Sequence, residues 1–298
     1  MPVYNYATQF TNLLQKKYAA ECKSHALTQS NQNVGFVNAQ IIKLPKMTMS
    51  GYKDHIRTQG FNAGTMSNDW EAKKLEFDRD IEFFIDPVDI DETNLTLSVA
   101  NMQNVFEETQ AIPEKDCYRF SKLYSELNTY QSANITSAVI DATNFLEAFD
   151  ELMEKMDEAG VPEGCRILYV TPKMNKIAKQ AKEIERTIII SGASQSINRK
   201  VHSLDDVQII MVPSDRMKTA YDFSNGFTAA ASAGQINMIL IHTSCVVCKE
   251  KYAYIKLFTP GSDSRTGDGY IYQNRYFGDL FLLQLKADGV AMNITPHA

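Results

Sequence analysis

Apolar and acidic residues alternate with a period of two over residues 75–85. Most even positions are acidic, and the odd positions hold Leu75, Phe77, Ile81, Phe83 and Ile85. Successive side chains of a strand point to opposite faces, so this pattern predicts a half-buried strand. Residues 36–49 also resemble an extended strand, and residues 58–69 are rich in glycine and asparagine, which predicts a turn. We expect one long hairpin, whose tip has too few apolar residues to bury itself within one subunit.

A helical spacing of apolar residues replaces this alternation after residue 90. Acidic residues at positions 91 and 92 favour the positive end of a helix dipole. Apolar residues then recur at steps of three and four, at Leu95, Val99, Met102 and Phe106. Pro113 begins a second such run, at a position where helices tolerate proline. We therefore expect residues 92–127 to be mainly helical. A break or kink is expected near Ile112 and Pro113, because proline removes a backbone donor and restrains its predecessor.

Strands and helices alternate over residues 136–245, which predicts a compact α/β lobe. An amphipathic stripe over residues 142–156 predicts a helix that ends at Gly160, with Asn144 and Glu147 as a capping pair. Almost wholly apolar runs predict buried strands at residues 165–171, 186–190, 207–212 and 236–242.

Outside this lobe, the C-terminal end of the chain is predicted to be β structure and the N-terminal end an arm. Strands are predicted at residues 251–258 and 270–276, around a loop at residues 262–269. Asp288-Gly289 then predicts a two-residue hairpin between residues 281–286 and 290–295. Residues 1–35 have the character of an arm, with a short amphipathic helix around residues 7–20 and a polar stretch after it.

Composition and charge narrow the functional classes. The 298 residues are 44% hydrophobic and 22% charged, which is ordinary for a globular protein. A net charge of −6 disfavours sequence-specific DNA binding, which usually needs a basic excess, but it is compatible with a wall that encloses DNA. Five scattered cysteines predict free thiols in a reducing cytoplasm. There is no secretory signal pattern, and no apolar run approaches the ~20 residues that span a bilayer.

Motifs for catalysis or metal binding are missing from the sequence. It contains no phosphate-binding glycine loop, dinucleotide fingerprint, zinc-protease motif or nucleophile elbow. Cys245 and Cys248 have a suggestive spacing, but a zinc site needs about four ligands. We expect two buried thiols on opposite faces of a strand. His242 is expected to be a core histidine, and Asp205-Asp206 a solvated pair. These observations predict no catalytic residue, no metal and no cofactor.

Two segments together resemble a known family. The first is TQGFNAGTMSNDWEAKKLEFDRDIEFFIDPVDIDET at residues 58–93, which leads into NMQNVFEETQAIPEKDCYRFSKLY at residues 101–124. The second is GDGYIYQNRYFGDLFLLQLKADGVAMN at residues 267–293. In order and character they resemble the major capsid proteins of tailed bacteriophages with the Hong Kong 97-type fold. That resemblance covers about a third of the chain.

The resemblance implies an α+β fold with four parts. Residues 1–35 would be the N-terminal arm and residues 50–85 the extended loop. The peripheral domain would comprise residues 36–49, residues 86–135 with a long spine helix, and the closing strands at residues 246–298. Residues 136–245 would be the α/β axial domain. The implied function is self-assembly into pentamers and hexamers, which form an icosahedral phage head around double-stranded DNA. The implied location is the virion, after synthesis in the cytoplasm of a bacterial host.

The same resemblance suggests contacts. The extended loop would contact a neighbouring subunit through Gly60, Phe61, Met66, Trp70 and Lys73. Trp70 is either part of a local hairpin cluster or an intersubunit anchor, since tryptophan is enriched at binding hot spots. Lys16, Lys17 and Lys23 on the arm form either a solvated face or a contact with scaffold or DNA.

The implied partners are other copies of the chain, a portal protein and non-specifically bound DNA, with no membrane. About 35 residues precede the first strand, so we expect a separate scaffolding protein and not a fused one. Relatives that crosslink use a loop lysine, and Lys53, Lys73 and Lys74 are available, although lysines in such a strand are usually solvated. Two alternatives remain. An encapsulin-like compartment would share the fold, and an α/β enzyme would need a polar pocket in residues 136–245.

Overall fold

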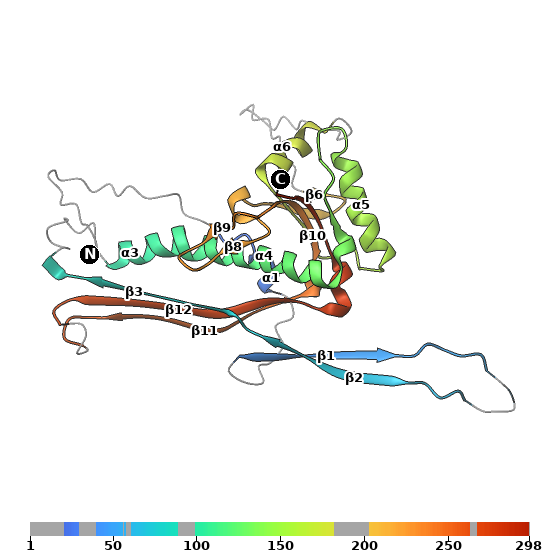
Figure 1. The fold of residues 1–298 in the computed structure, drawn as a ribbon, viewed down its shortest axis with the longest axis horizontal. Coiled ribbons are helices and arrows are strands. Elements are labelled where there is room, and N and C mark those ends of the chain that lie inside the picture. Colours follow the sequence, from blue (N-terminus) through green and yellow to red (C-terminus); the bar gives the residue numbers. More distant parts are fainter. Residues whose placement is uncertain are drawn as a thin grey trace, which may run out of the picture.

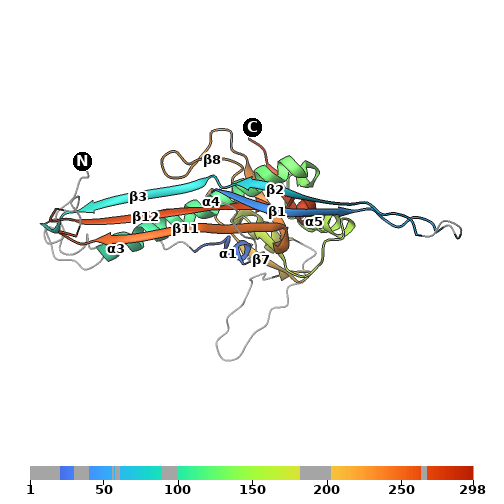
Figure 2. The same ribbon diagram turned by 90° about the horizontal axis from the view of Figure 1, so that it is seen from below.

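The computed structural model describes residues 21–29, 40–55, 57, 61–88, 99–181, 203–262 and 267–297. The chain is elongated, with a compact lobe on one side of a long helix and a sheet on the other (Figure 1). A two-stranded hairpin projects beyond both along the long axis (Figure 2). Within the described residues, no helix is long and apolar enough to cross a membrane.

A three-stranded antiparallel sheet underlies the long helix. It consists of β11 (Val246–Phe258), β12 (Tyr270–Leu282) and β3 (Phe77–Ile85), in the order β11-β12-β3. The half-buried strand predicted from the alternation is confirmed in β3, since Phe77 and Ile85 are buried while the acidic residues between them are exposed. The prediction that this strand returns the hairpin was wrong, because β3 pairs with β12 over its whole length.

The hairpin itself is built from β1 (Ile41–Met49) and β2 (Met66–Lys74), in register from Ile41 opposite Lys74 to Met49 opposite Met66. The predicted strand at residues 36–49 is confirmed where it is described. The predicted turn at residues 58–69 was too long, since its last four residues belong to β2. Those residues are polar, yet a strand that projects into solvent can carry polar side chains on both faces while its backbone bonds to β1.

The long helix runs through α3 (Val99–Phe106), a π-helical turn η1 (Glu107–Ala111) and α4 (Ile112–Tyr130). The predicted helix is confirmed where it is described, whereas residues 92–98 lie outside the described part. The break or kink expected near Ile112 and Pro113 takes the form of this π-helical turn, which ends close to the proline, and the helix does not break, because both Ala111 and Ile112 keep helical angles. The Ile112 N–H donates to the Glu107 carbonyl, five residues back. This wider turn accommodates a ring that would otherwise clash with the carbonyl four residues earlier.

The lobe contains a six-stranded sheet in the order β4-β13-β10-β5-β7-β6. Its strands are β4 (Ile135–Thr136), β5 (Arg166–Val170), β6 (Ser203–Leu204), β7 (Val207–Met211), β10 (Gln235–His242) and β13 (Val290–Thr295). Its helices are α5 (Phe145–Glu158) and α6 (Pro172–Gln180). Three predicted strands are therefore confirmed, and the fourth, at residues 186–190, lies outside the described part.

Short elements complete the chain. They are α1 (His25–Thr28), η2 (Ser132–Asn134), η3 (Ser214–Arg216), β8 (Tyr221–Asp222), β9 (Thr228–Ala229), η4 (Thr243–Cys245) and η5 (Gln284–Gly289).

Two local predictions in this region were wrong. Asp288-Gly289 does not join two paired strands, because β12 ends at Leu282, η5 follows, and β13 enters the lobe sheet between β4 and β10. The first five residues of β13 are all buried, as expected for a central strand covered on both faces. Asn144 precedes α5, but its side chain accepts from the Asp141 N–H at 2.7 Å and does not cap the helix. Gly160, with a φ of +69°, ends this helix as predicted.

The buried apolar residues form three clusters. The largest lies between α4, the lobe sheet and the junction of β11 with β12, and includes Phe120, Tyr169 and Leu280. A second lies under α5 and α6. The third contains Ile42, Leu44, Leu75, Val247, Phe277 and Phe281, and it anchors the base of the hairpin on the three-stranded sheet.

Candidate assembly interface

One face of the hairpin is apolar and uncovered. Residues directly opposite each other in an antiparallel pair lie on the same face, so Met49 joins Met66 and Pro45 joins Trp70. Met47, Met49, Met66 and Trp70, which we call the hairpin face, are 51%, 68%, 68% and 55% exposed. Monomeric proteins rarely leave neighbouring large apolar side chains uncovered. The hairpin face is therefore a candidate interface.

The tip of the hairpin adds aromatic and basic side chains. Tyr52 and Phe61 are fully exposed, and the Phe61 ring centroid lies 6.2 Å from that of His55. Asn62 fixes the tip by donating to the Asp54 carbonyl at 2.8 Å. Phe61, Met66 and Trp70 are each more than half exposed, so they form no buried cluster within the chain. Gly60, which was predicted beside them, lies outside the described residues.

Lys73 occupies a different environment from the hairpin face. Its ammonium lies 3.2 Å from Glu71 Oε1 and 3.8 Å from Glu126 Oε1, and it donates to the Tyr130 hydroxyl. Burial alone would lower the pKa of Lys73, but Tyr130 and the two carboxylates outweigh it and raise the pKa. Lys73 thus ties β2 to α4 of its own chain. A contact between Lys73 and a neighbouring subunit stays a prediction.

A second support lies where β2 passes into β3. The buried Asp279 carboxylate accepts from the Glu76 N–H at 2.9 Å and from the Tyr118 hydroxyl at 2.8 Å. Lys122 also bonds to Glu76, at 2.9 Å. Burial raises the pKa of Asp279. Sequence reasoning missed this support, although an aspartate inside the apolar run FGDLFLL could have signalled a buried polar contact.

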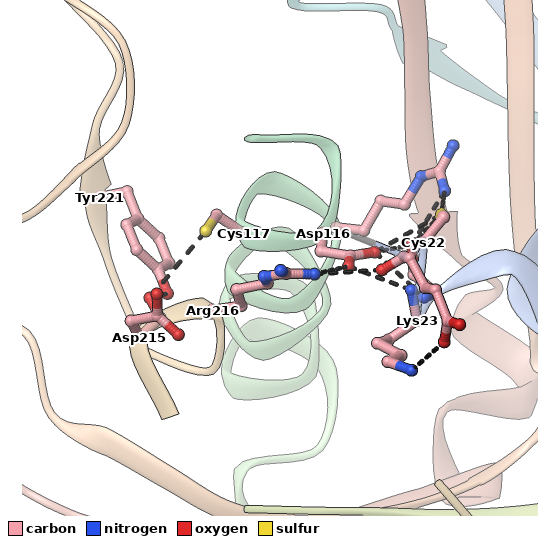
Figure 3. Close-up of polar contacts among 10 residues, drawn as sticks. Cys22, Lys23, Asp116, Cys117, Asp215, Arg216 and Tyr221 are labelled. Atoms are coloured by element: carbon pink, nitrogen blue, oxygen red, sulfur yellow. Dashed lines mark hydrogen bonds and ion pairs between the residues drawn. The ribbon is translucent and has the colours of Figure 1, made fainter. Parts of the chain in front are cut away.

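Residues 21–29, in the predicted arm, are held by a buried carboxylate on α4. Asp116 accepts from the Ser24 hydroxyl at 2.7 Å, from the Ser24 N–H at 3.0 Å and from the Lys23 N–H at 3.1 Å. Arg216, from η3 in the lobe, reaches the same carboxylate at 3.2 Å (Figure 3). We call this group the arm clasp. It joins the arm, the long helix and the lobe, and sequence reasoning did not find it.

The predicted arm lysines stand apart from these contacts. Only the main chain of Lys23 takes part in the arm clasp, since its ammonium pairs with Glu21 at 2.6 Å in an exposed position. Lys16 and Lys17 lie outside the described residues. Their predicted contacts with scaffold or DNA stay predictions.

The cysteine pair is buried as expected, but in one core cluster and not on opposite faces. Cys245 belongs to the 3-10 turn η4, so the alternation of a strand does not apply to it. Burial raises the pKa of Cys245 to about 12, which keeps the thiol protonated and unreactive at neutral pH. His242 is buried, and its Nδ1 lies 2.8 Å from the Ser244 hydroxyl.

Asp205 and Asp206 form an exposed turn. Among the described residues, no three metal-binding side chains gather.

Comparison with known proteins identifies the fold. No protein-family model matches the sequence, and no curated protein is significantly similar to it. Among solved structures, a chain from the asymmetric unit of the bacteriophage PhiM1 mature capsid has a TM-score of 0.67 at 12% identity, over 97% of this chain and 91% of that one.

Two further structures agree. A chain of the cyanophage P-SCSP1u capsid has a TM-score of 0.63 at 11% identity, over 96% of this chain and 92% of that one. A chain from the capsid of an empty GTA particle has a TM-score of 0.62 at 8% identity, over 97% and 95%. This chain therefore has the fold of phage capsid chains, as its resemblance to that family predicted. The assignment of its subdomains stays a prediction.

Proposed function

We propose that this chain is the major capsid protein of a tailed phage, and that it assembles into pentamers and hexamers of an icosahedral head around double-stranded DNA. One observation carries the proposal beyond the fold: the projecting hairpin face is uncovered in the single chain. Fully burying one large apolar side chain stabilises by about 1.5–3 kcal/mol. Covering four half-exposed ones on a neighbour would contribute roughly 3–6 kcal/mol per hairpin.

An energy of this size suits assembly. Placing two subunits together costs several kcal/mol in lost motion, so a single hairpin contact on its own is weak. A misplaced subunit can then dissociate, because differences in affinity lie mostly in the off-rate. A closed ring or shell becomes stable because each subunit makes several such contacts.

The test is a variant that removes the apolar hairpin face and keeps the strands: Met47→Thr, Met49→Thr, Met66→Thr and Trp70→Thr. We expect a folded monomer by circular dichroism that forms no capsomers or shells in sedimentation and electron microscopy. The control, Val139→Thr with Leu285→Thr, removes exposed apolar side chains elsewhere, and it should assemble normally. Closed particles from the hairpin variant would refute the proposed role of this face.

The contents of the particle separate a phage head from a compartment of the same fold. A phage head made during infection should protect DNA of phage-genome length from nuclease. A compartment would instead enclose protein cargo. Recovery of a protein cargo without protected DNA would contradict the proposal.

The partners we propose are a portal protein, non-specifically bound DNA and a separate scaffolding protein. Lys16, Lys17 and Lys23 on the arm are the proposed contacts with scaffold during assembly or with DNA afterwards. Because a separate scaffold leaves no fused segment to be removed, the arm should stay attached in mature particles. Mass analysis of capsid subunits should show an intact N-terminus, apart from Met1. Loss of tens of residues would contradict this part of the proposal.

A further inference from the structure

The sheet under the long helix ends in a long edge strand. In the described part of the chain, the order β11-β12-β3 gives β11 a partner on one side only (Figure 2). This strand is 13 residues long. A long exposed edge is a template for pairing with another strand, and proteins usually keep such edges short or covered. The edge of β11 is therefore a candidate surface for a second chain.

A bulge divides β11 into two parts. Its register against β12 shifts between Glu250 and Tyr252, which leaves Lys251 as the extra residue. From Tyr252 to Phe258 the pairing with β12 is regular. A bulge interrupts the ladder of a sheet, so a further strand on the outer edge would pair over residues 252–258. We call these residues the edge segment.

The edge segment exposes large apolar side chains. Tyr252, Ile255 and Leu257 are 46%, 54% and 42% exposed. Ile255 pairs with Asn274, whose amide donates to Glu107 of the π-helical turn at 2.6 Å. Ile255 and Leu257, two residues apart in one strand, therefore lie on the face of the sheet that carries the long helix. A sheet that continued past β11 would cover them.

The other face of the edge segment carries aromatic rings and cations. The rings of Tyr252 and Tyr254 stack, with centroids 6.2 Å apart and an angle of 8° between their planes. The guanidinium of Arg275 lies 5.7 Å from the centroid of Tyr252, and the ammonium of Lys256 lies 4.4 Å from that of Phe258. Rings and cations attract each other, so this face favours a partner that presents the same two groups.

One register makes the edge segment complementary to itself. Two strands related by a twofold axis run antiparallel, so a pair centred on Ile255 would place Ile255 of each copy opposite Ile255 of the other. The other opposed pairs would be Tyr252 with Phe258, Ala253 with Leu257, and Tyr254 with Lys256. They oppose two rings, a small and a large apolar residue, and a ring and an ammonium, all of which are favourable across strands.

The neighbouring registers are less favourable. A pair centred on Lys256 would bring two ammonium groups directly opposite each other, which is destabilising. A pair centred on Tyr254 would place Leu257 opposite the bulged Lys251, outside the regular ladder. The centre at Ile255 uses the whole edge segment and keeps like charges apart. Charge and regularity therefore favour the same register.

We infer that the edge segment pairs with the edge segment of a second copy around a twofold axis, with Ile255 at the centre. Two three-stranded sheets would then join into one. Neighbours within a ring of five or six are related by rotation about the ring axis, whereas a twofold contact uses the same patch on both partners. This contact would therefore link one ring to another. The inference rests on the proposed function, because it names the contact that joins pentamers and hexamers into a shell.

Charges at the centre of the pair test the contact. In Ile255→Lys and in Ile255→Glu, like charges would oppose each other across the twofold axis. Each variant should still form rings, because the hairpin face is unchanged, but its rings should associate on the order of tenfold more weakly than those of the parent. Rings of the two variants, mixed one to one, should associate with each other about as well as parent rings. Sedimentation measures association, electron microscopy shows rings and shells, and circular dichroism checks folding.

Two matched controls accompany these variants. Val139→Lys adds the same charge at an exposed apolar position in the lobe and should assemble normally. Leu257→Lys mixed with Leu257→Glu should not recover association, because Leu257 lies opposite Ala253 in the inferred register and not opposite itself.

Crosslinking in assembled particles tests the register directly. The exposed Cys165 is first replaced by serine, so that it does not react. In this background, a bis-maleimide with a two-carbon linker should join Ile255→Cys chains into covalent dimers. Leu257→Cys chains should stay single, because their thiols would lie four residues apart along the paired strands, about 13 Å. The double variant Ala253→Cys with Leu257→Cys should form dimers.

The outcomes separate this contact from the capsid function. Closed shells from Ile255→Lys at the parent's yield, or dimers from Leu257→Cys as readily as from Ile255→Cys, would overturn the edge pairing and leave the capsid function standing. Failure of the parent and of Val139→Lys to assemble under any condition would overturn the capsid function, and the edge pairing with it.

Discussion

Replacing Asp116 by alanine would test what holds residues 21–29 on the long helix. The substitution removes the acceptor for the Ser24 hydroxyl, for two backbone N–H groups and for Arg216. Ser24 is fully buried, and the Arg216 side chain is only 12% exposed. The donors on Lys23 and Ser24 would therefore lose their acceptor in a site that water reaches poorly, whereas Arg216 keeps the Glu21 carbonyl at 3.1 Å.

The size of the effect decides which part of the chain responds. Removing one partner of a buried ion pair costs about 3–5 kcal/mol. The opposing contribution that keeps the arm docked is the burial of Leu27, which is worth about 1.5–3 kcal/mol. Two hydrogen bonds also remain, from Arg119 to the Ser24 hydroxyl at 2.9 Å and from Arg216 to the Glu21 carbonyl at 3.1 Å. The first value exceeds the second, so the variant gains free energy by releasing the arm to water. We therefore expect local opening of residues 21–29 and little change in global unfolding.

Hydrogen exchange by mass spectrometry measures this opening directly. The amides of residues 21–29 should exchange on the order of a hundredfold faster in Asp116→Ala, since each 1.4 kcal/mol changes an equilibrium tenfold. Asp215→Ala removes an exposed carboxylate close by and should leave exchange unchanged. Asp116→Asn keeps one acceptor oxygen and should lie between the two. Parent-like exchange in Asp116→Ala would refute the arm clasp.

Three further predictions concern the core and the hairpin base. Replacing Cys245 and Cys248 together with alanine should lower the free energy of urea unfolding by about 1–3 kcal/mol, and elemental analysis should find no stoichiometric zinc in the parent; zinc that the double variant loses would contradict this. Burial lowers the pKa of His242, so its contribution to stability is present above pH 6.5 and is lost as the pH falls below that value. The unfolding free energies of the parent and His242→Gln should therefore converge between pH 7.5 and 5.5, and a constant difference would refute the assignment. Lys73→Ala should keep the hairpin face but loosen the direction in which the hairpin projects, which should broaden the distribution of particle diameters in electron microscopy. Lys173→Ala, at an exposed position on α6, is the control; a uniform diameter for both variants would count against the role of Lys73.

Local periodicity predicted those elements whose burial is set by their immediate neighbours. The alternation in β3, the stripe of α5 and the apolar run of β5 each record which face is covered. The π-helical turn was missed because proline signals a disturbed helix without specifying how the chain accommodates it. A break and a wider turn have the same sequence signal, and the packing of α4 on β12 favours continuity.

Strand partners were harder to predict than strands. Pairing depends on long-range burial, and nearest neighbours in sequence gave two wrong hairpins. One signal was present for β13, since VAMNI is apolar at every position except Asn293, which is typical of a central strand and not of a solvent-exposed hairpin arm. The turn signal at residues 288 and 289 led us to predict a hairpin instead. Gly289 is needed for close packing and not for a hairpin turn, since a Cβ there would lie 3.2 Å from the Cβ of Cys245.

The sequence could predict that the hairpin carries an exposed contact surface, but it could not predict the buried contacts that hold the neighbouring segments in place. A tryptophan beside a polar, glycine-rich tip indicated either a local hairpin cluster or an intersubunit anchor. Trp70 is exposed, so it forms no buried cluster, and its role as an anchor stays a prediction. The arm clasp had no comparable signal. Asp116 stands between a lysine and a cysteine on a helix, and its partner Ser24 is 92 residues away in sequence. A buried carboxylate becomes recognisable only when the chain brings donors from three separate elements to it.

The hairpin has a fixed base and an uncovered face, and this contrast is how we expect it to avoid aggregation and still drive the proposed assembly. Two long strands with free edges and an apolar face invite non-specific pairing. Here Lys43, Lys46 and Lys74 lie along those strands, and lysines on edge strands oppose edge-to-edge pairing of like hairpins. These lysines therefore oppose edge-to-edge pairing of two hairpins. Because the base is fixed by Leu44, Phe281 and Lys73, the direction in which the hairpin projects is set by the fold. A shell of uniform curvature requires a contact between subunits that is weak and has a fixed direction. It also requires that two hairpins do not pair with each other.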